Sequence, residues 1–345
     1  MGNYIFILGR DPELSVLELK SYLEARNIEY EILEKNKHLV VLEMQKLDFN
    51  KMIKELGGIV KIAETGFKSF YDGEKNKVLY GESNYGSSLE IDFRQEFKKE
   101  GINAYLNAKG IITPSKSLRL DAEFILFKDY LGKIIAVFNP KEYKERDKRP
   151  FLDPLRVSSI RLSKILINLS QAREGDLLLD PFCGLGTVLQ EALLMNVKVI
   201  GLDKDAKTVK QCEANLNWLG KKGFEVFKAD AVELSKHVKE VDCVATEPYL
   251  GPFLKRLPTD GEAKKIVKEL EKLYFDLFKE FDKVVKKRVA IILPRFRTRN
   301  NERYKVDVNS IIEGTDFEVV DDFPIDYYGE ESRIEREIWV LKRKV

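Results

Sequence analysis

Cysteine and histidine are scarce in this sequence. Its 345 residues include three cysteines, Cys183, Cys212 and Cys243, and two histidines, His38 and His237. No C-x-x-C pair occurs and the histidines lie far apart, so we expect neither a disulfide framework nor a metal site. The cysteines lie in apolar or motif contexts, which predicts small buried side chains in a reducing, cytoplasmic environment.

Long apolar runs and a strong net charge are also missing. No run approaches the roughly 18 residues of a membrane-spanning helix, and the N-terminus lacks the cationic leader of a signal peptide. The formal net charge is only +2 at pH 7, so any case for nucleic-acid binding has to be local. We expect a cytoplasmic protein of two or three domains, not bound to a membrane.

What the chain does have is a glycine-containing loop with the sequence DPFCGLGT at residues 180–187. An apolar strand pattern precedes the loop and a helical pattern follows it. Two glycines at such a corner let a ligand approach the backbone closely, and the next helix begins with unpaired N–H groups. Loops of this kind bind a phosphate, a carboxylate or the edge of a nucleoside.

Three further predicted strands also end in polar residues. The first ends in Asp203, the next leads to Asp230, and the last leads to TEPY at residues 246–249. On a parallel sheet such ends meet at one ligand-binding edge, where a carboxylate at Asp203 could accept ribose hydroxyls. A dinucleotide enzyme is the competing interpretation, but the third glycine of that fingerprint is missing.

These motifs resemble those of class I S-adenosylmethionine-dependent methyltransferases, of the branch that methylates exocyclic amines of nucleobases. The resemblance implies a Rossmann-like sheet and a cofactor whose methionine part, ribose and adenine are held at successive strand ends. The cofactor-binding residues that it implies are Asp180, Pro181, Phe182, Gly184, Gly186, Thr187, Asp203, Lys204, Asp230 and Ala231.

The fourth strand end departs from the motif of that branch, which is Asp, Asn or Ser followed by Pro-Pro-aromatic. The alignment makes Thr246, Glu247, Pro248 and Tyr249 the catalytic residues, with Tyr249 stacking on an extruded base. Thr246 and the main-chain carbonyl of Glu247 could accept the amine hydrogens. Alternatively, the Glu247 carboxylate accepts them or takes the proton as it leaves. We favour the role of the carboxylate.

Other segments of the C-terminal half have simpler interpretations. A helix is predicted over residues 157–169 with Arg161 and Lys164 facing solvent, and another over 264–285 with an apolar stripe facing the core. A strand over 289–293 is predicted to end at Pro294 and to open into a basic segment. Cations near this edge are candidates for substrate phosphates. The RNA-binding candidates are Lys255, Arg256, Arg295, Arg297 and Arg299.

The front half predicts two α/β pieces. A βαββαβ order over residues 4–63 is the ferredoxin-like plan, and a helix over 89–99, a strand over 102–106 and a hairpin around Leu131-Gly132 follow. A charged stretch, 141–149, is predicted as a solvated linker. The expected domains are a ferredoxin-like domain 1–66, a THUMP-like RNA-binding domain 67–140, a linker 141–156 and a methyltransferase domain 157–345.

This order resembles the THUMP-containing tRNA guanosine N2-methyltransferases that act at position 10. The segments that resemble this family most specifically are LGGIVKIA at residues 56–63 and FKKEGINA at 97–104. The resemblance implies methyl transfer from S-adenosylmethionine to N2 of a guanosine in tRNA, giving N2-methyl- or N2,N2-dimethylguanosine. A catalytically inactive tRNA-binding protein and a DNA or ribosomal RNA amino-methyltransferase stay open as alternatives. The need for a small activator subunit, as in some relatives, stays open too.

Overall fold

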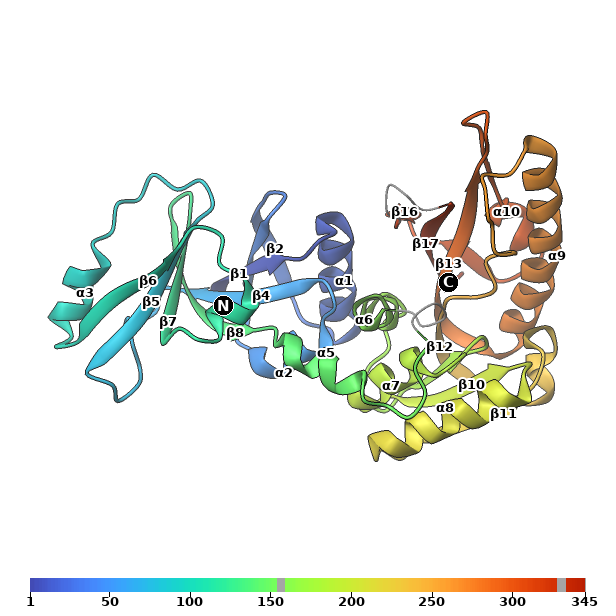
Figure 1. The fold of residues 1–345 in the computed structure, drawn as a ribbon, viewed down its shortest axis with the longest axis horizontal. Helices are drawn as coiled ribbons and strands as arrows, with labels where there is room; N and C mark the ends of the chain where they lie inside the picture. The colour runs from blue at the N-terminus through green and yellow to red at the C-terminus, as the bar shows by residue number, and fades with distance from the viewer. Residues whose placement is uncertain (154–158, 328–332, 345) are drawn as a thin grey trace. The chain divides into compact units, whose positions relative to one another are not determined.

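The computed structural model describes residues 1–153, 159–327 and 333–344. The chain forms two compact units, Met1–Lys148 and Arg149–Val345, and each is built on its own sheet (Figure 1). Within the described residues, no helix has the length and apolar character needed to cross a bilayer.

The first unit begins with the predicted βαββαβ order. Its elements are β1 (Gly2–Leu8), α1 (Pro12–Ala25), β2 (Tyr30–Lys35), β3 (Leu39–Met44), α2 (Phe49–Glu55) and β4 (Ile59–Thr65). The four strands pair antiparallel in the order β2-β3-β1-β4, and apolar residues of both helices share one core with one face of these strands. This part of the prediction is confirmed.

The same sheet continues into the region predicted as THUMP-like. The elements there are β5 (Lys77–Asn84), α3 (Phe93–Lys99), β6 (Asn103–Lys109), α4 (Pro114–Ser117), β7 (Ala122–Phe127) and β8 (Tyr130–Val137). Because β4 pairs with β8, eight strands form one sheet in the order β2-β3-β1-β4-β8-β7-β5-β6. Strand β5, which the sequence patterns did not predict, lies between β7 and β6.

The predicted position of the hairpin turn, around Gly132, is wrong. Phe127 pairs with Tyr130, so the turn consists of residues 128 and 129. Gly132 lies inside β8, where a Cβ would come within 2.8 Å of Cδ1 of Ile5. This glycine therefore permits close packing beneath the strand.

The stretch predicted as a solvated linker begins in a helix, α5 (Pro140–Arg146). The Asn139 side chain caps the helix by accepting a hydrogen bond from the Lys141 N–H, and Pro140 occupies the first turn, where its missing N–H is not needed. The sequence patterns did not predict this helix, but none of its residues is buried, as expected for a solvated segment. Residues 154–156 of the predicted linker lie outside the described residues.

The second unit carries a mostly parallel sheet, in the order β11-β10-β9-β12-β13-β17-β15. The strands are β9 (Leu177–Asp180), β10 (Lys198–Asp203), β11 (Phe224–Lys228), β12 (Val241–Thr246), β13 (Val285–Arg297), β14 (Arg303–Lys305), β15 (Phe317–Val319), β16 (Ile325–Asp326) and β17 (Ile334–Arg343). The helices are α6 (Ile160–Leu169), α7 (Thr187–Leu194), α8 (Ala206–Leu219), the 3₁₀ helix η1 (Ala231–Lys236), α9 (Asp260–Val284) and α10 (Val308–Ile311).

The direction in which strands are added reverses between β9 and β12. Strands β10 and β11 extend the sheet on one side of β9, and β12 and β13 extend it on the other, all in parallel pairs. Strand β17 then pairs antiparallel with β13 and β15. The Rossmann-like sheet with an antiparallel closing pair is confirmed, and its switch point lies at the ends of β9 and β12.

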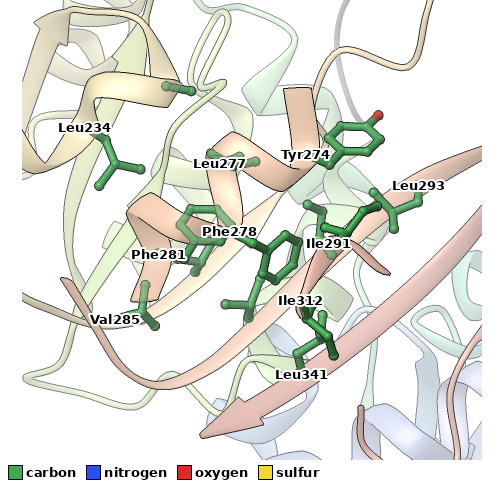
Figure 2. Packing of buried hydrophobic residues seen from close by; sticks show 14 of the residues in the cluster. Leu234, Tyr274, Leu277, Phe278, Phe281, Val285, Ile291, Leu293, Ile312 and Leu341 are labelled. Carbon is green, nitrogen blue, oxygen red and sulfur yellow. The ribbon is translucent and has the colours of Figure 1, made fainter. Parts of the chain in front are cut away.

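Helix α9 packs its predicted apolar stripe against the sheet. The Thr259 hydroxyl accepts from the Glu262 N–H and the Glu262 carboxylate accepts from the Thr259 N–H, so a capping box begins the helix. Figure 2 shows the packing of the stripe with residues of β13 and β17. Its buried members are Leu270, Tyr274, Leu277, Phe278 and Phe281.

Two details of the C-terminal half were predicted wrongly. Lys164, expected to face solvent, is 2% exposed, and its Nζ lies 3.9 Å from Oε2 of Glu191 on α7. Residues 162–169 of α6 are all buried, so the buried surface of this helix extends beyond its predicted apolar face. Residues 157 and 158, at the predicted start of this helix, lie outside the described residues.

Pro294 does not end the strand, because β13 continues to Arg297. Pairing with β12 stops at Ile291 and pairing with β14 starts at Arg295, so Pro294 has a described strand partner only on the β17 side. A proline is tolerated where one side of a strand is not paired.

Candidate functional site

Three aspartates at the ends of adjacent parallel strands turn the chain in the same way. The Oδ1 atoms of Asp180, Asp203 and Asp230 each accept a hydrogen bond from the backbone N–H two residues later, at 3.1, 2.8 and 3.2 Å. Such turns hold the carboxylate at the strand end. Because β9, β10 and β11 are neighbours and parallel, the three side chains follow the same edge of the sheet.

The glycine loop joins the end of β9 to the start of α7. Gly184 and Gly186 have φ angles of +50° and +84°, in the left-handed region that favours glycine. A Cβ on Gly186 would also lie 2.7 Å from Sγ of Cys212 on α8, so no side chain fits there. Cys183, Cys212 and Cys243 are all buried, which confirms the predicted burial of the cysteines.

A buried hydrogen bond crosses the switch point of the sheet. The Thr246 hydroxyl, at the end of β12, donates to Oδ1 of Asp180 at 2.7 Å, and the two residues are 0% and 3% exposed. Burial raises the pKa of Asp180 to about 7, against the lowering effect of its hydrogen bonds from Thr246 and Phe182. Thr246 therefore contacts the glycine loop directly.

Glu247, the next residue, has a charged partner far along the chain. The Nε of Arg336 on β17 donates to its Oε1 at 3.0 Å, and the two side chains are 37% and 17% exposed in that order. Sequence patterns did not identify Arg336, because nothing in the local sequence indicates a contact across 89 residues.

The last two residues of the motif differ in exposure. Pro248 is buried, whereas Tyr249 is 53% exposed. The hydroxyl of Tyr274 on α9 donates to the Tyr249 carbonyl at 2.8 Å. The backbone is thus anchored while the aromatic ring stays accessible.

The other predicted cofactor-binding residues surround the same loop and strand ends. Pro181, Thr187 and Ala231 are buried, Phe182 is half-buried and Lys204 is exposed. Within the described parts of the chain, no group of three or more His, Cys, Asp or Glu residues is arranged to hold a metal ion.

The five predicted RNA-binding cations have different surroundings. Arg295 is 14% exposed and contacts Glu335, Glu337 and Asp326, with Nε 2.6 Å from Oε2 of Glu335. Arg256 donates twice to the Glu262 carboxylate, at 2.7 and 2.9 Å.

The remaining three of these cations reach solvent to different extents. The Nε of Arg299 donates to the Leu257 carbonyl at 3.1 Å. Arg297 is half-buried and Lys255 is exposed. Arg295 and Arg256 therefore have carboxylate partners within the protein, whereas Lys255 points to solvent.

A groove of about 470 Å³ lies between the segment after the TEPY motif and the first turns of α9. Phe253 lines it and is 85% exposed, which is unusual for a phenylalanine. Lys255, Arg256 and Lys265 also line the groove, but none of the strand-end aspartates does. The groove is therefore separate from the three strand-end aspartates.

Comparison with known proteins agrees with this geometry. The UPF0020 family model, an RMKL-like methyltransferase domain, matches residues 146–302. TrmN from Thermus thermophilus has a crystal structure that superposes with a TM-score of 0.51 at 14% identity, covering 99% of this chain and 100% of TrmN. That likeness shows the fold.

Two curated relatives are both tRNA (guanine(10)-N2)-dimethyltransferases. The protein from Methanothermobacter thermautotrophicus is 30% identical over 267 residues, which are 73% of this chain and 78% of the relative. The protein from Pyrococcus abyssi is 28% identical over 307 residues, 84% of this chain and 88% of the relative. With a Rossmann-like sheet, strand-end aspartates and relatives that match over most of their length, this chain belongs to the family of tRNA (guanine(10)-N2)-dimethyltransferases.

Proposed function

We propose that this protein methylates the exocyclic N2 of a guanosine in tRNA, at position 10, using S-adenosylmethionine. The product is N2-methylguanosine or, after a second transfer, N2,N2-dimethylguanosine. The family membership supports the substrate class. The three buried free cysteines are consistent with a reducing, cytoplasmic environment.

The observation that carries the proposal is the bond from Thr246 to Asp180. It connects the residue before Glu247 with the glycine loop, so a ligand held by the loop and a base held at the TEPY motif would meet at one switch point. Two reactants that are held close together in the right orientation react much faster than free ones.

The residues present fit a nucleoside-containing cofactor. Asp203 and Asp230 offer carboxylates of the kind that accept ribose hydroxyls and an amine. At Gly184 the backbone carries no side chain, and a Cβ there would have the Phe182 carbonyl oxygen as its nearest neighbour, 3.9 Å away, so this side of the loop has room for a ligand. When bound, S-adenosylmethionine supplies an electrophilic methyl group. The loop residues Asp180 to Thr187 would hold its methionine part, and Asp203 and Asp230 its ribose and adenine.

In this proposal, the Glu247 carboxylate accepts a hydrogen bond from the guanine amine and then takes its proton. Thr246 is enclosed and its hydroxyl hydrogen is directed at Asp180, which favours Glu247 over Thr246 for contact with the base. A guanine amine is a poor nucleophile because its lone pair is delocalised into the ring. A carboxylate that accepts its N–H favours the reactive pyramidal form and takes the proton as the N–C bond forms. The exposed ring of Tyr249 would stack on the extruded base.

RNA contacts are proposed at the groove beside this motif and in the N-terminal unit. Lys255 is exposed on the groove rim, and Phe253 offers an accessible ring for base stacking. Arg297 and Arg299 are further candidates. Arg295 and Arg256 already contact carboxylates of the protein. They are therefore weaker candidates for phosphate binding.

The test is methyl transfer to a defined tRNA. Purified protein, unmodified tRNA and labelled S-adenosylmethionine should give label at guanosine 10 when the nucleosides are mapped. A tRNA with adenosine at position 10 is the matched control and should stay unlabelled. Label on both tRNAs would contradict the assigned position. If only ribosomal RNA or DNA is labelled at matched salt, that nucleic acid is the substrate class and tRNA is not. Transfer that requires a cell extract would indicate an activator subunit.

A further inference from the structure

Arg336 lies on the antiparallel strand β17, 89 residues after the TEPY motif's Glu247 in the sequence. Side chains alternate between the two faces of a strand, so Arg336 points opposite to its neighbours Glu335 and Glu337. Those two are 3% exposed and contact Arg295. Arg336 instead donates from Nε to Oε1 of Glu247 at 3.0 Å.

The backbone that carries Arg336 is held firmly in register. Strand β17 pairs with β13 at nine consecutive positions, including Pro294 with Arg336. On the other face, the Arg295 guanidinium lies 2.6 Å from Glu335 and 3.0 Å from Glu337. A guanidinium presented from such a strand has a defined position relative to the end of β12.

We propose that Arg336 is a positioning residue for methyl transfer, because it orients the Glu247 carboxylate toward the substrate amine. This inference rests on the proposed function. A guanidinium is permanently charged and directional, whereas a carboxylate has about four lone-pair sites. Glu247 can therefore contact Arg336 and still accept an amine N–H. As the nitrogen–carbon bond forms, the sulfur–methyl bond of the donor breaks and its electron pair stays on sulfur. The alkylated nitrogen thereby becomes strongly acidic, so its proton passes to the Glu247 carboxylate even beside an arginine.

The magnitudes separate this role from a structural one. A partly exposed ion pair contributes little to stability, so the loss of Arg336 should leave the fold intact. Misplacement of a reacting group by about 1 Å can cost on the order of 100-fold in rate. An effect on turnover without an effect on stability is therefore the expected signature.

The experiment is a double-mutant cycle of Arg336→Ala and Glu247→Ala in the full-length protein. Turnover number and KM for tRNA are measured at saturating S-adenosylmethionine, and the affinity for S-adenosylhomocysteine is measured by calorimetry. We expect Arg336→Ala to lower turnover about 10- to 100-fold with cofactor affinity unchanged. In the Glu247→Ala background the same substitution should have no further effect. Arg336→Lys should restore part of the turnover.

Lys342→Ala is the matched control. Lys342 lies on the same strand and contacts Glu318 at 3.1 Å with a side chain 42% exposed, close to the 3.0 Å and 37% of Arg336. Its removal should leave turnover unchanged.

Three outcomes would overturn the inference. They are an equal fall in turnover in both backgrounds, a rise in KM for tRNA with turnover intact, and a fall in melting temperature that Arg336→Lys does not reverse. The wild-type protein alone tests the proposed function: if it binds S-adenosylhomocysteine but methylates no tRNA, that function fails before any variant is compared.

Discussion

The residues on the two sides of the switch point are held in place by contacts that differ in their separation along the sequence. On the side that we propose binds the cofactor (the cofactor side), Asp180, Asp203 and Asp230 each bond to the backbone two residues away. On the side that we propose binds the base (the reaction side), the TEPY residues bond to partners 25, 66 and 89 residues away. The cofactor side can thus form from local turns, whereas the reaction side depends on the completed sheet. Substitutions on the two sides should have separable effects.

The sharpest test of that separation compares Glu247→Ala with Asp203→Ala. Glu247→Ala should lower turnover by about 100-fold or more, because a positioned proton acceptor contributes about 10²–10⁴. Its affinity for S-adenosylhomocysteine should stay within twofold of wild type. Asp203→Ala should weaken that affinity by about 10- to 100-fold, since a hydrogen bond to a charged group is worth about 1.5–3 kcal/mol. Calorimetry and initial rates measure both. Equal cofactor affinity of wild type and Asp203→Ala would break the comparison.

The same difference in range explains what could be predicted from the sequence. The glycine loop, the strand-end aspartates and the stripe of α9 follow from patterns of about a dozen residues or fewer at a time. The Arg336 contact, the burial of Lys164 and the pairing of Arg295 with Glu335 depend on which strands and helices become neighbours. Gly132 shows the same limit, since a glycine that permits contact with Ile5 looks like a turn glycine in the sequence.

A second test concerns Asp180, the one residue that belongs to both sides. Its pKa is raised by burial from 3.8 to about 7, so the unfolded chain binds fewer protons than the folded one between these values. The contribution to stability is fully present below about pH 4 and is lost as pH rises through about 7. Asp180→Asn keeps an acceptor for Thr246 but does not titrate.

The stability difference between Asp180→Asn and wild type should therefore change in favour of the variant, by a few kcal/mol, as pH rises from about 4 to 8. Thermal unfolding of the two proteins across this range measures it. Groups that do not interact with Asp180 titrate equally in both proteins and cancel. Parallel stability curves would mean that Asp180 ionises normally and that the Thr246 bond spans a solvated site.

Glycine substitutions test how tightly the cofactor side is packed. Gly184→Ala and Gly186→Ala share the strain of a positive φ, roughly 1 kcal/mol. Only Gly186→Ala also places a Cβ 2.7 Å from the Cys212 sulfur, which should cost about a further 1–3 kcal/mol. Urea unfolding measures both variants, and Gly184→Ala is the matched control. Equal losses would show that α8 moves away at little cost.

The smallest expected effect concerns the contact of the reaction side with RNA. Lys255→Ala should raise KM for tRNA about two- to threefold and reduce the slope of log KM against log salt by about 1, as for one lost phosphate contact. Lys210→Ala removes an exposed lysine from α8, the helix that follows Asp203, and should leave the slope unchanged. An unchanged slope for Lys255→Ala would mean that the Lys255 side chain contacts solvent and no RNA phosphate. The phosphate contacts would then have to lie elsewhere, with the N-terminal unit as the next surface to test.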